Sequence, residues 1–184
     1  LLATLKRLKV DEILDRHYPS GHRWKGDLTK GEVACVWIAF ITSQGDHRLC
    51  QLQPWAEAHL HTLSACLGKT VRSLDFHDDR LADLLDHFAL DEHSGHLAWQ
   101  DFEIDLNQHT VRVYDLDADF FRIDTTTANT YAEVRDDLGY IQFGHSKDRD
   151  DLPQIKIPLA TLDPLGMPVT TLVVPGNWAD DPLY

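Results

Sequence analysis

The chain has 184 residues, which is enough for one domain, or for one small domain and part of a second. Its composition, 43% apolar and 26% charged, is that of an ordinary globular protein and excludes low-complexity and fibrous classes. The longest apolar run, Val33–Ile41, is too short to cross a bilayer, so we expect no membrane partner. Three cysteines without a CxxC spacing predict reduced, mostly buried thiols in a cytoplasmic protein, with neither a disulfide frame nor a zinc knuckle.

The net charge of −13 argues at first sight against a nucleic-acid partner, but the charge is unevenly distributed. Residues 1–74 carry ten Lys and Arg against seven Asp and Glu, whereas residues 75–119 carry two against thirteen. The acidity is therefore concentrated in the middle of the chain. The mildly basic N-terminal segment permits a DNA contact there without demonstrating one.

Residues 1–100 predict a helical N-terminal domain. Apolar residues at helical intervals over 2–17 favour one amphipathic helix or two short ones. Thr29 with Glu32 three residues later predicts a capping box that opens an apolar helix, which Gly45 closes. The same periodicity predicts further helices over 49–67 and 78–90.

A short loop at 22–26 is basic and contains one aromatic residue, Trp24. Its two cations, Arg23 and Lys25, are candidates for contact with DNA phosphates. A solvated loop with one anchoring tryptophan is the alternative interpretation. The scattered histidines lack zinc-site spacing and are expected at the surface or in hydrogen bonds.

Residues 101–119 are interpreted as a connector, within which 102–106 fits either a short strand or a helix end. From residue 120 the period becomes strand-like. A strand is expected at 120–127, a polar loop at 130–151, and a hairpin of two strands at 154–162 and 167–175. The turn between them is Asp163–Gly166, and Pro158 should face an edge or a bulge. The fold class is therefore α+β.

Asp124 is the most informative residue of the second domain. The pattern around it predicts a buried strand that delivers this acid to its end, followed by Thr125–Thr127. A carboxylate in a sheet loses solvation unless something pairs with it, and a hard cation such as Mg²⁺ is one such partner. The alternative is a turn cap in which Asp124 accepts a hydrogen bond from a threonine hydroxyl or a backbone N–H.

Several segments appear in an order that resembles bacterial insertion-sequence transposases of the DDE superfamily. They are Asp124–Thr126, Gly144–Asp148, Leu152–Ile155, Asp163–Gly166 and Gly176–Asp180. The helix that begins Asp78-Asp79-Arg80-Leu81 is similar to the helical region before the catalytic domain in one subgroup. The resemblance covers most of the chain and is strongest from about residue 74 onward. It implies that residues 120–184 are the first three antiparallel strands of an incomplete RNase H-like catalytic core.

The resemblance also implies metal-dependent phosphoryl transfer on DNA. In the family two Asp and one Glu hold two divalent ions, Mg²⁺ or Mn²⁺, that clamp the attacking and leaving oxygens. Asp124 matches the first catalytic Asp and would be a metal ligand. The second Asp and the Glu have no match in these 184 residues, and Asp180 is more typical of a turn or helix cap. Lys147 and Arg149 are further candidates for DNA phosphate contact, although they lie among three Asp.

The sequence therefore predicts a transposase fragment that does not cut or join DNA as it stands. The implied partners are the terminal inverted repeats of an insertion sequence and, in the complete protein, a second copy; the implied location is the nucleoid of the cytoplasm. A non-enzymatic DNA-binding or dimerising module that inhibits the full-length transposase is the alternative. An unrelated acidic hydrolase, which would need a full set of acids in this chain, is a weaker one.

Overall fold

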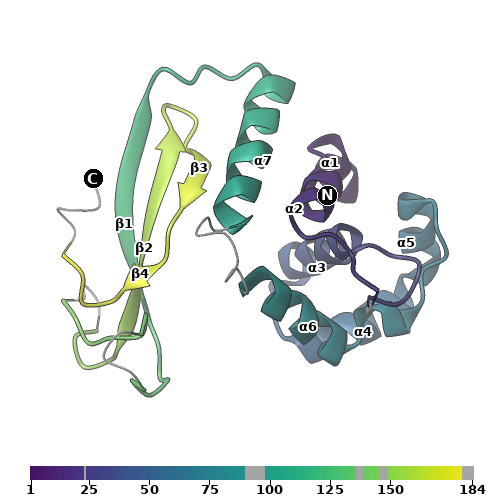
Figure 1. The fold of residues 1–184 in the computed structure, drawn as a ribbon, viewed down its shortest axis with the longest axis horizontal. Helices are drawn as coiled ribbons and strands as arrows, with labels where there is room; N and C mark the ends of the chain where they lie inside the picture. Colours follow the sequence, from purple (N-terminus) through teal and green to yellow (C-terminus); the bar gives the residue numbers. More distant parts are fainter. Residues whose placement is uncertain (23, 90–97, 136–138, 146–148, 180–184) are drawn as a thin grey trace. The chain divides into compact units, whose positions relative to one another are not determined.

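The chain divides into two compact units, Leu1–Val113 and Tyr114–Tyr184 (Figure 1). The computed structural model describes residues 1–22, 24–89, 98–135, 139–145 and 149–179. The first unit is helical and the second contains antiparallel strands, which confirms the expected α+β class. The helices are α1 Leu2–Arg7, α2 Val10–His17, α3 Lys30–Gln44, α4 Leu49–Ala58, α5 Leu60–Leu67, the 3₁₀ helix η1 Ser73–Phe76, α6 Asp78–Ala89 and α7 Ala98–Tyr114.

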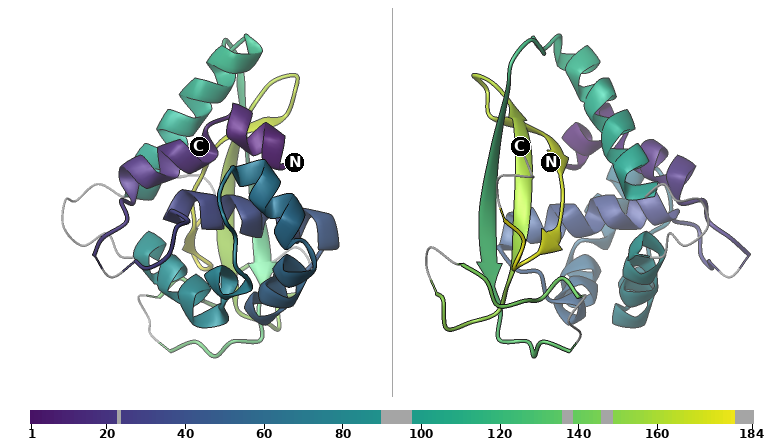
Figure 2. Two further views of the ribbon diagram at one scale, coloured as in Figure 1. Left: turned by 90° about the vertical axis from the view of Figure 1, so that its right-hand side faces the viewer. Right: turned by 60° about the vertical axis from the view of Figure 1, so that its left-hand side comes forward.

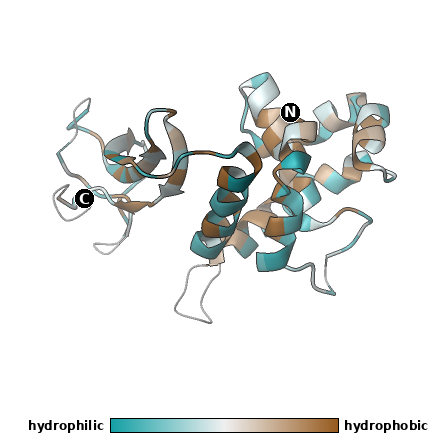
Figure 3. Ribbon diagram, turned by 90° about the horizontal axis from the view of Figure 1, so that it is seen from above, coloured by the Kyte–Doolittle hydropathy of each residue, from teal (hydrophilic) through white to brown (hydrophobic). Residues whose placement is uncertain are grey.

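Helix α3 is the centre of the first unit because it is apolar around most of its circumference. Ten of its fifteen residues are buried, and the neighbouring helices add hydrophobic stretches interleaved with hydrophilic ones (Figure 3). The expected capping box is present: Glu32 N donates to Thr29 Oγ1 at 3.2 Å and Thr29 N donates to Glu32 Oε2 at 2.9 Å. Gly45 ends the helix with a φ of 63°, a left-handed conformation that favours glycine.

The remaining helices show how many helices form in the segments for which periodicity allowed either one or two. The segment 2–17 forms two helices separated at Lys9, whose φ is 53°, and 49–67 also forms two. Residues 98–114, interpreted from sequence as the domain end and connector, form one helix, α7. This segment is helical because Phe102 and Leu106 pack on the core of the first unit. Asp105 lies between them on the chain and binds His17 and Arg16 of α2 at 2.9 and 3.0 Å.

The cysteines correct one expectation. Cys35 on α3 is buried, but Cys50 and Cys66 are exposed, because α4 and α5 turn these positions away from the apolar stripe. Within the described ranges, no helix is long and apolar enough to cross a membrane.

The second unit is built on an antiparallel sheet of β1 Phe121–Asn129, β2 Gln154–Leu162, β3 Met167–Thr171 and the two-residue β4 Val174–Pro175. Strand β2 lies between β1 and β3, and β4 pairs with β2 beyond the end of β3. Figures 1 and 2 show β1 running beside β2. The register places Asp124 opposite Leu159, and the turn at 163–166 connects β2 to β3 as expected.

Proline 158 explains why the predicted strand 167–175 is interrupted. Leu172 N donates to the Pro158 carbonyl at 3.0 Å, so the backbone of Pro158 faces residues 172–173, between β3 and β4. Proline has no N–H to offer on that edge. The ladder therefore stops at Thr171 and resumes at Val174, as the sequence expectation of an edge or bulge at Pro158 implies.

Candidate functional site

Asp124 occupies the fourth position of β1, and its side chain is exposed. Its Oδ1 accepts a hydrogen bond from the backbone N–H of Thr125 at 2.8 Å. The prediction of a buried strand that ends at this acid is wrong in both respects. Pairing with β2 continues as far as Asn129, and the described part of this unit contains no helix to form a second layer over β1.

The neighbours of Asp124 on its face of the sheet follow from the register. Arg122 and Thr126 flank it on β1 because alternate side chains share a face, and Leu159 lies opposite on β2. Arg122 pairs with Asp163 through Nη2 and Oδ1 at 3.1 Å. Thr125, on the other face, is buried, and its Oγ1 has no hydrogen-bond partner. Asp124 is therefore an exposed carboxylate whose nearest neighbours on this face of the sheet are Arg122, Thr126 and Leu159.

A metal site was tested against the acids of the described residues. Only His77, Asp78 and Asp79, at the start of α6, form a group of three or more residues whose ligand atoms all lie within 4.8 Å of one another. Asp124 is not in this group. The described residues therefore do not fit the three-acid, two-ion site that the resemblance implies at Asp124.

The predicted DNA contacts differ in their surroundings. Lys25 is exposed on the loop between α2 and α3. Arg149 forms two bonds of 2.7 Å with Asp151, which raise the pKa of the guanidinium and lower the pKa of the carboxyl. A phosphate at Arg149 would therefore have to compete with Asp151. Arg23 and Lys147, together with Asp180, lie outside the described residues.

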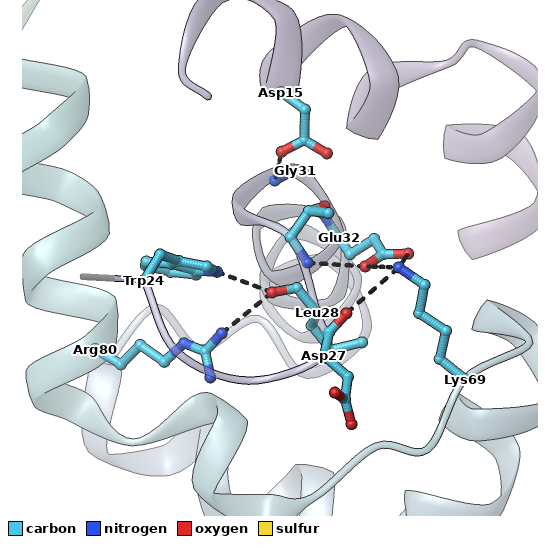
Figure 4. Close-up of polar contacts among 9 residues, drawn as sticks. Asp15, Trp24, Asp27, Leu28, Gly31, Glu32, Lys69 and Arg80 are labelled. Atoms are coloured by element: carbon cyan, nitrogen blue, oxygen red, sulfur yellow. Dashed lines mark hydrogen bonds and ion pairs between the residues drawn. The ribbon is translucent and has the colours of Figure 1, made fainter. Parts of the chain in front are cut away.

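The loop that carries Lys25 is anchored on its inner side (Figure 4). Trp24 Nε1 and Arg80 Nη2 both donate to the Leu28 carbonyl, at 2.8 and 3.2 Å. The Arg80 guanidinium carbon lies 4.3 Å from the centre of the Trp24 ring, and Nη1 pairs with Asp75 at 2.9 Å. This agrees with the interpretation of an anchoring tryptophan. Sequence reasoning gave Arg80 no role, because Trp24 and Leu28, the loop residues that it contacts, are distant in the chain.

Three of the segments that carry the family resemblance converge around Gln154, which is completely buried. Its Nε2 donates to the carbonyl oxygens of Gly176 and His145 at 2.8 and 3.1 Å. Its backbone forms a two-bond bridge with Gln142, at 3.0 and 2.9 Å. We call Gln142, Gly144, His145, Gln154 and Gly176 the glutamine cluster.

Two glycines allow the glutamine cluster to close. A Cβ on Gly176 would overlap the Gln154 carbonyl oxygen, and a Cβ on Gly144 would overlap the Gly176 carbonyl oxygen. Nearby, the buried Lys156 donates through Nζ to the Trp178 carbonyl at 2.6 Å. Sequence reasoning quoted these segments as motifs but assigned Gln154 no role, since glutamine in a strand is not itself a signal of burial.

Comparisons of the chain with protein-family models, with curated proteins and with solved structures give no match.

Proposed function

We propose that the second unit is the opening part of the catalytic domain of a metal-dependent DNA phosphoryltransferase of the DDE transposase type. The observation that carries this proposal is the exposed carboxylate of Asp124 on β1, the first strand of the antiparallel sheet. The resembling segments follow Asp124 in the expected order, and those at 144–145, 154 and 176 meet in the glutamine cluster. The first unit would bind the DNA end or a second copy.

Asp124 is proposed as a ligand of Mg²⁺ or Mn²⁺, the ions whose chemistry in such enzymes is to activate the attacking oxygen and stabilise the leaving one. A single carboxylate leaves most of the coordination shell to water and phosphate. Because the described residues form no group of three metal ligands at Asp124, we expect the 184-residue chain to leave DNA intact. The complete site would need an Asp and a Glu from elsewhere in a full transposase.

The glutamine cluster would serve this site as a support. Gln154 fixes the backbone of His145, at the start of the segment that leads to Arg149, and the backbone of Gly176. Asn129, the last residue of β1, donates to the Arg149 carbonyl at 3.0 Å. Arg149 is thereby held at the end of the strand that carries Asp124, where its side chain would contact the DNA backbone.

The second candidate is a DNA-binding or dimerising module without catalysis. It is favoured by the absence, among the described residues, of a three-ligand group that includes Asp124 and by the exposure of Lys25 on a loop that Trp24 and Arg80 anchor. Such a module would act in the nucleoid by occupying inverted repeats or by pairing with a complete transposase. Its binding needs Lys25 and not Asp124.

Plasmid nicking and duplex-DNA binding, measured with Mg²⁺ and with Mn²⁺, test both candidates. We expect no nicking by the wild-type chain. DNA binding should be unchanged by Asp124→Asn, weakened by Lys25→Ala, and unchanged by the control Lys9→Ala, whose cation is paired with Glu12 at 3.1 Å. Nicking by wild type and Asp124→Asn alike would remove the support for both the site and the family.

The encoding DNA beyond the Tyr184 codon supplies a second test. A reading frame that continues with a strand ending in Asp and a helix carrying Glu, inside inverted repeats, would support a transposase with Asp124 as its first ligand. A frame that continues without those acids would contradict the proposal. A stop codon at that point would favour the binding module.

A further inference from the structure

Helix α5 of the first unit lies in a part of the chain that contains no carboxylate side chain. Residues 58–74 are the longest stretch of the sequence without Asp or Glu, although the whole chain carries a net charge of −13. Lys69 and Arg72 follow the helix within this stretch. In an acidic protein, such a surface is where a polyanion meets the least repulsion.

The helix has one face in the core and one face in solvent. Leu63 and Leu67 are buried. The exposed residues of α5 are small or can form hydrogen bonds, and they are His61, Thr62, Ala65 and Cys66. Figure 1 shows α5 at the periphery of the first unit. Small side chains allow the helix to approach a partner closely, and histidine and threonine can donate or accept hydrogen bonds.

The segment after α5 is tied to the loop that carries the exposed Lys25. Lys69 Nζ pairs with Glu32 Oε1 at 2.8 Å and donates to the Asp27 carbonyl at 3.4 Å. Arg72 Nη2 lies 3.7 Å from Asp27 Oδ2. Because Lys25 is two residues before Asp27, the cations of Lys25 and Arg72 both belong to the surface beside the C-terminal end of α5.

We propose that the exposed face of α5 enters the major groove of duplex DNA, while Lys25 and Arg72 contact the phosphates beside it. The eight residues of α5 form a helix about 12 Å long, and the major groove is about 12 Å wide and admits an α-helix. His61 and Thr62 face the base edges, which present donors and acceptors. The inference rests on the proposed function for its partner, DNA, and does not involve Asp124.

The other helices of the first unit fit a polyanion less well. Among the described helices of this unit, α1 and α5 alone contain no Asp or Glu. Helix α1 is followed directly by the first turn of α2, which carries Asp11 and Glu12. The face of α5 has no such neighbour within residues 58–74.

Asp27 opposes the binding of a phosphate at Arg72, because the two charges already pair. Their side chains are 61 and 69% exposed and the pair is long, so a phosphate displaces the carboxylate at little cost. Removal of this carboxylate should therefore strengthen DNA binding. The expected effect is opposite in sign to that of losing Arg72 itself.

Fluorescence anisotropy of the full chain with a labelled random-sequence duplex, at several salt concentrations, tests the inference. Thr62→Glu places a carboxylate on the exposed face of α5 and should raise Kd about tenfold or more. The matched control Thr4→Glu makes the same change at an exposed site, also the third residue of its helix, on α1. It should change Kd by less than about twofold, and circular dichroism confirms that both variants are folded.

Two further variants test the phosphate contact. Arg72→Ala should weaken binding and reduce the slope of log K against log salt by about one. Asp27→Asn should lower Kd, whereas the control Asp101→Asn, an exposed acid on α7, should leave it nearly unchanged. Figures 1 and 2 show α7 and α5 on different sides of the first unit.

A wild-type chain that does not bind the duplex, or equal effects of Thr62→Glu and Thr4→Glu, would overturn the inference. Binding that Lys25→Ala weakens and Thr62→Glu leaves unchanged overturns the role of α5 alone and keeps DNA as the partner of the first unit. Binding that depends on Thr62 and is indifferent to Asp124→Asn supports the α5 surface even where the metal-ligand proposal fails.

Discussion

The ion pair between Arg80 and Asp75 gives the sharpest stability prediction for the first unit. Their side chains are only 16 and 8% exposed, and Arg80 also bonds the Leu28 carbonyl and lies over Trp24. Arg80→Met keeps the aliphatic stem but leaves the Asp75 carboxylate buried with the Arg72 backbone N–H as its remaining partner. Breaking one side of a buried pair costs about 3 kcal/mol or more, so we expect Tm to fall by about 10 °C.

The matched control is Arg72→Met. Arg72 pairs with Asp27 at 3.7 Å, and the two side chains are 69 and 61% exposed. Loss of such a pair should cost less than about 1 kcal/mol. Urea unfolding followed by tryptophan fluorescence measures both variants, in a Trp178→Phe background so that the signal reports the first unit. Equal losses of stability in the two variants would refute the assignment of Arg80 and Asp75 as a buried anchor.

Three further predictions concern packing, pH and the glutamine cluster. Gly31→Ala should lower Tm strongly, because the added Cβ would overlap the Asp11 backbone. Gly21→Ala is the control: no atom lies within 4 Å of the added Cβ, so Tm should stay nearly unchanged. Burial raises the pKa of the Asp15 carboxyl in the folded state above its ordinary value of 3.8. The folded state therefore binds this proton more tightly than the unfolded state, and stability falls as pH rises from the unfolded-state pKa to the folded-state pKa. Asp15→Asn should flatten this dependence of stability on pH, measured by urea unfolding at a series of pH values. Gln154→Ala removes the hydrogen bonds that Gln154 Nε2 donates to the carbonyls of His145 and Gly176, and should lower the free energy of unfolding by about 2 kcal/mol or more, measured by calorimetry. The control Asn177→Ala changes an exposed side chain and should leave the free energy of unfolding nearly unchanged.

Local signals in the sequence predicted much of the secondary structure. The capping box at Thr29 and the glycine at 45 define the two ends of α3, Lys30–Gln44. The turn at 163–166 defines the hairpin of β2 and β3. These features depend on backbone groups and side chains that are neighbours along the chain, so no knowledge of the fold is needed to find them.

The surroundings of the candidate site could not be predicted in the same way. Sequence alone identified Asp124 and the segments that surround Gln154, but it placed Asp124 at a buried strand end. Burial depends on whether another layer covers the strand, and a pattern of strand-forming residues does not contain that information. For the same reason, residues 102–106 fit either a short strand or a helix end by sequence, and their packing on the first unit identifies them as part of α7.

The sequence by itself determined the helical first half, the strands with their connecting turn, and the single acid that merits a functional test. Only the tertiary structure revealed that Arg80 and Asp75 anchor the basic loop and that Gln154 joins three distant segments. It also revealed that, among the described residues, β1 pairs with β2. These features arise between residues far apart in the chain, whose proximity is set by the packing of whole elements and not by any local preference.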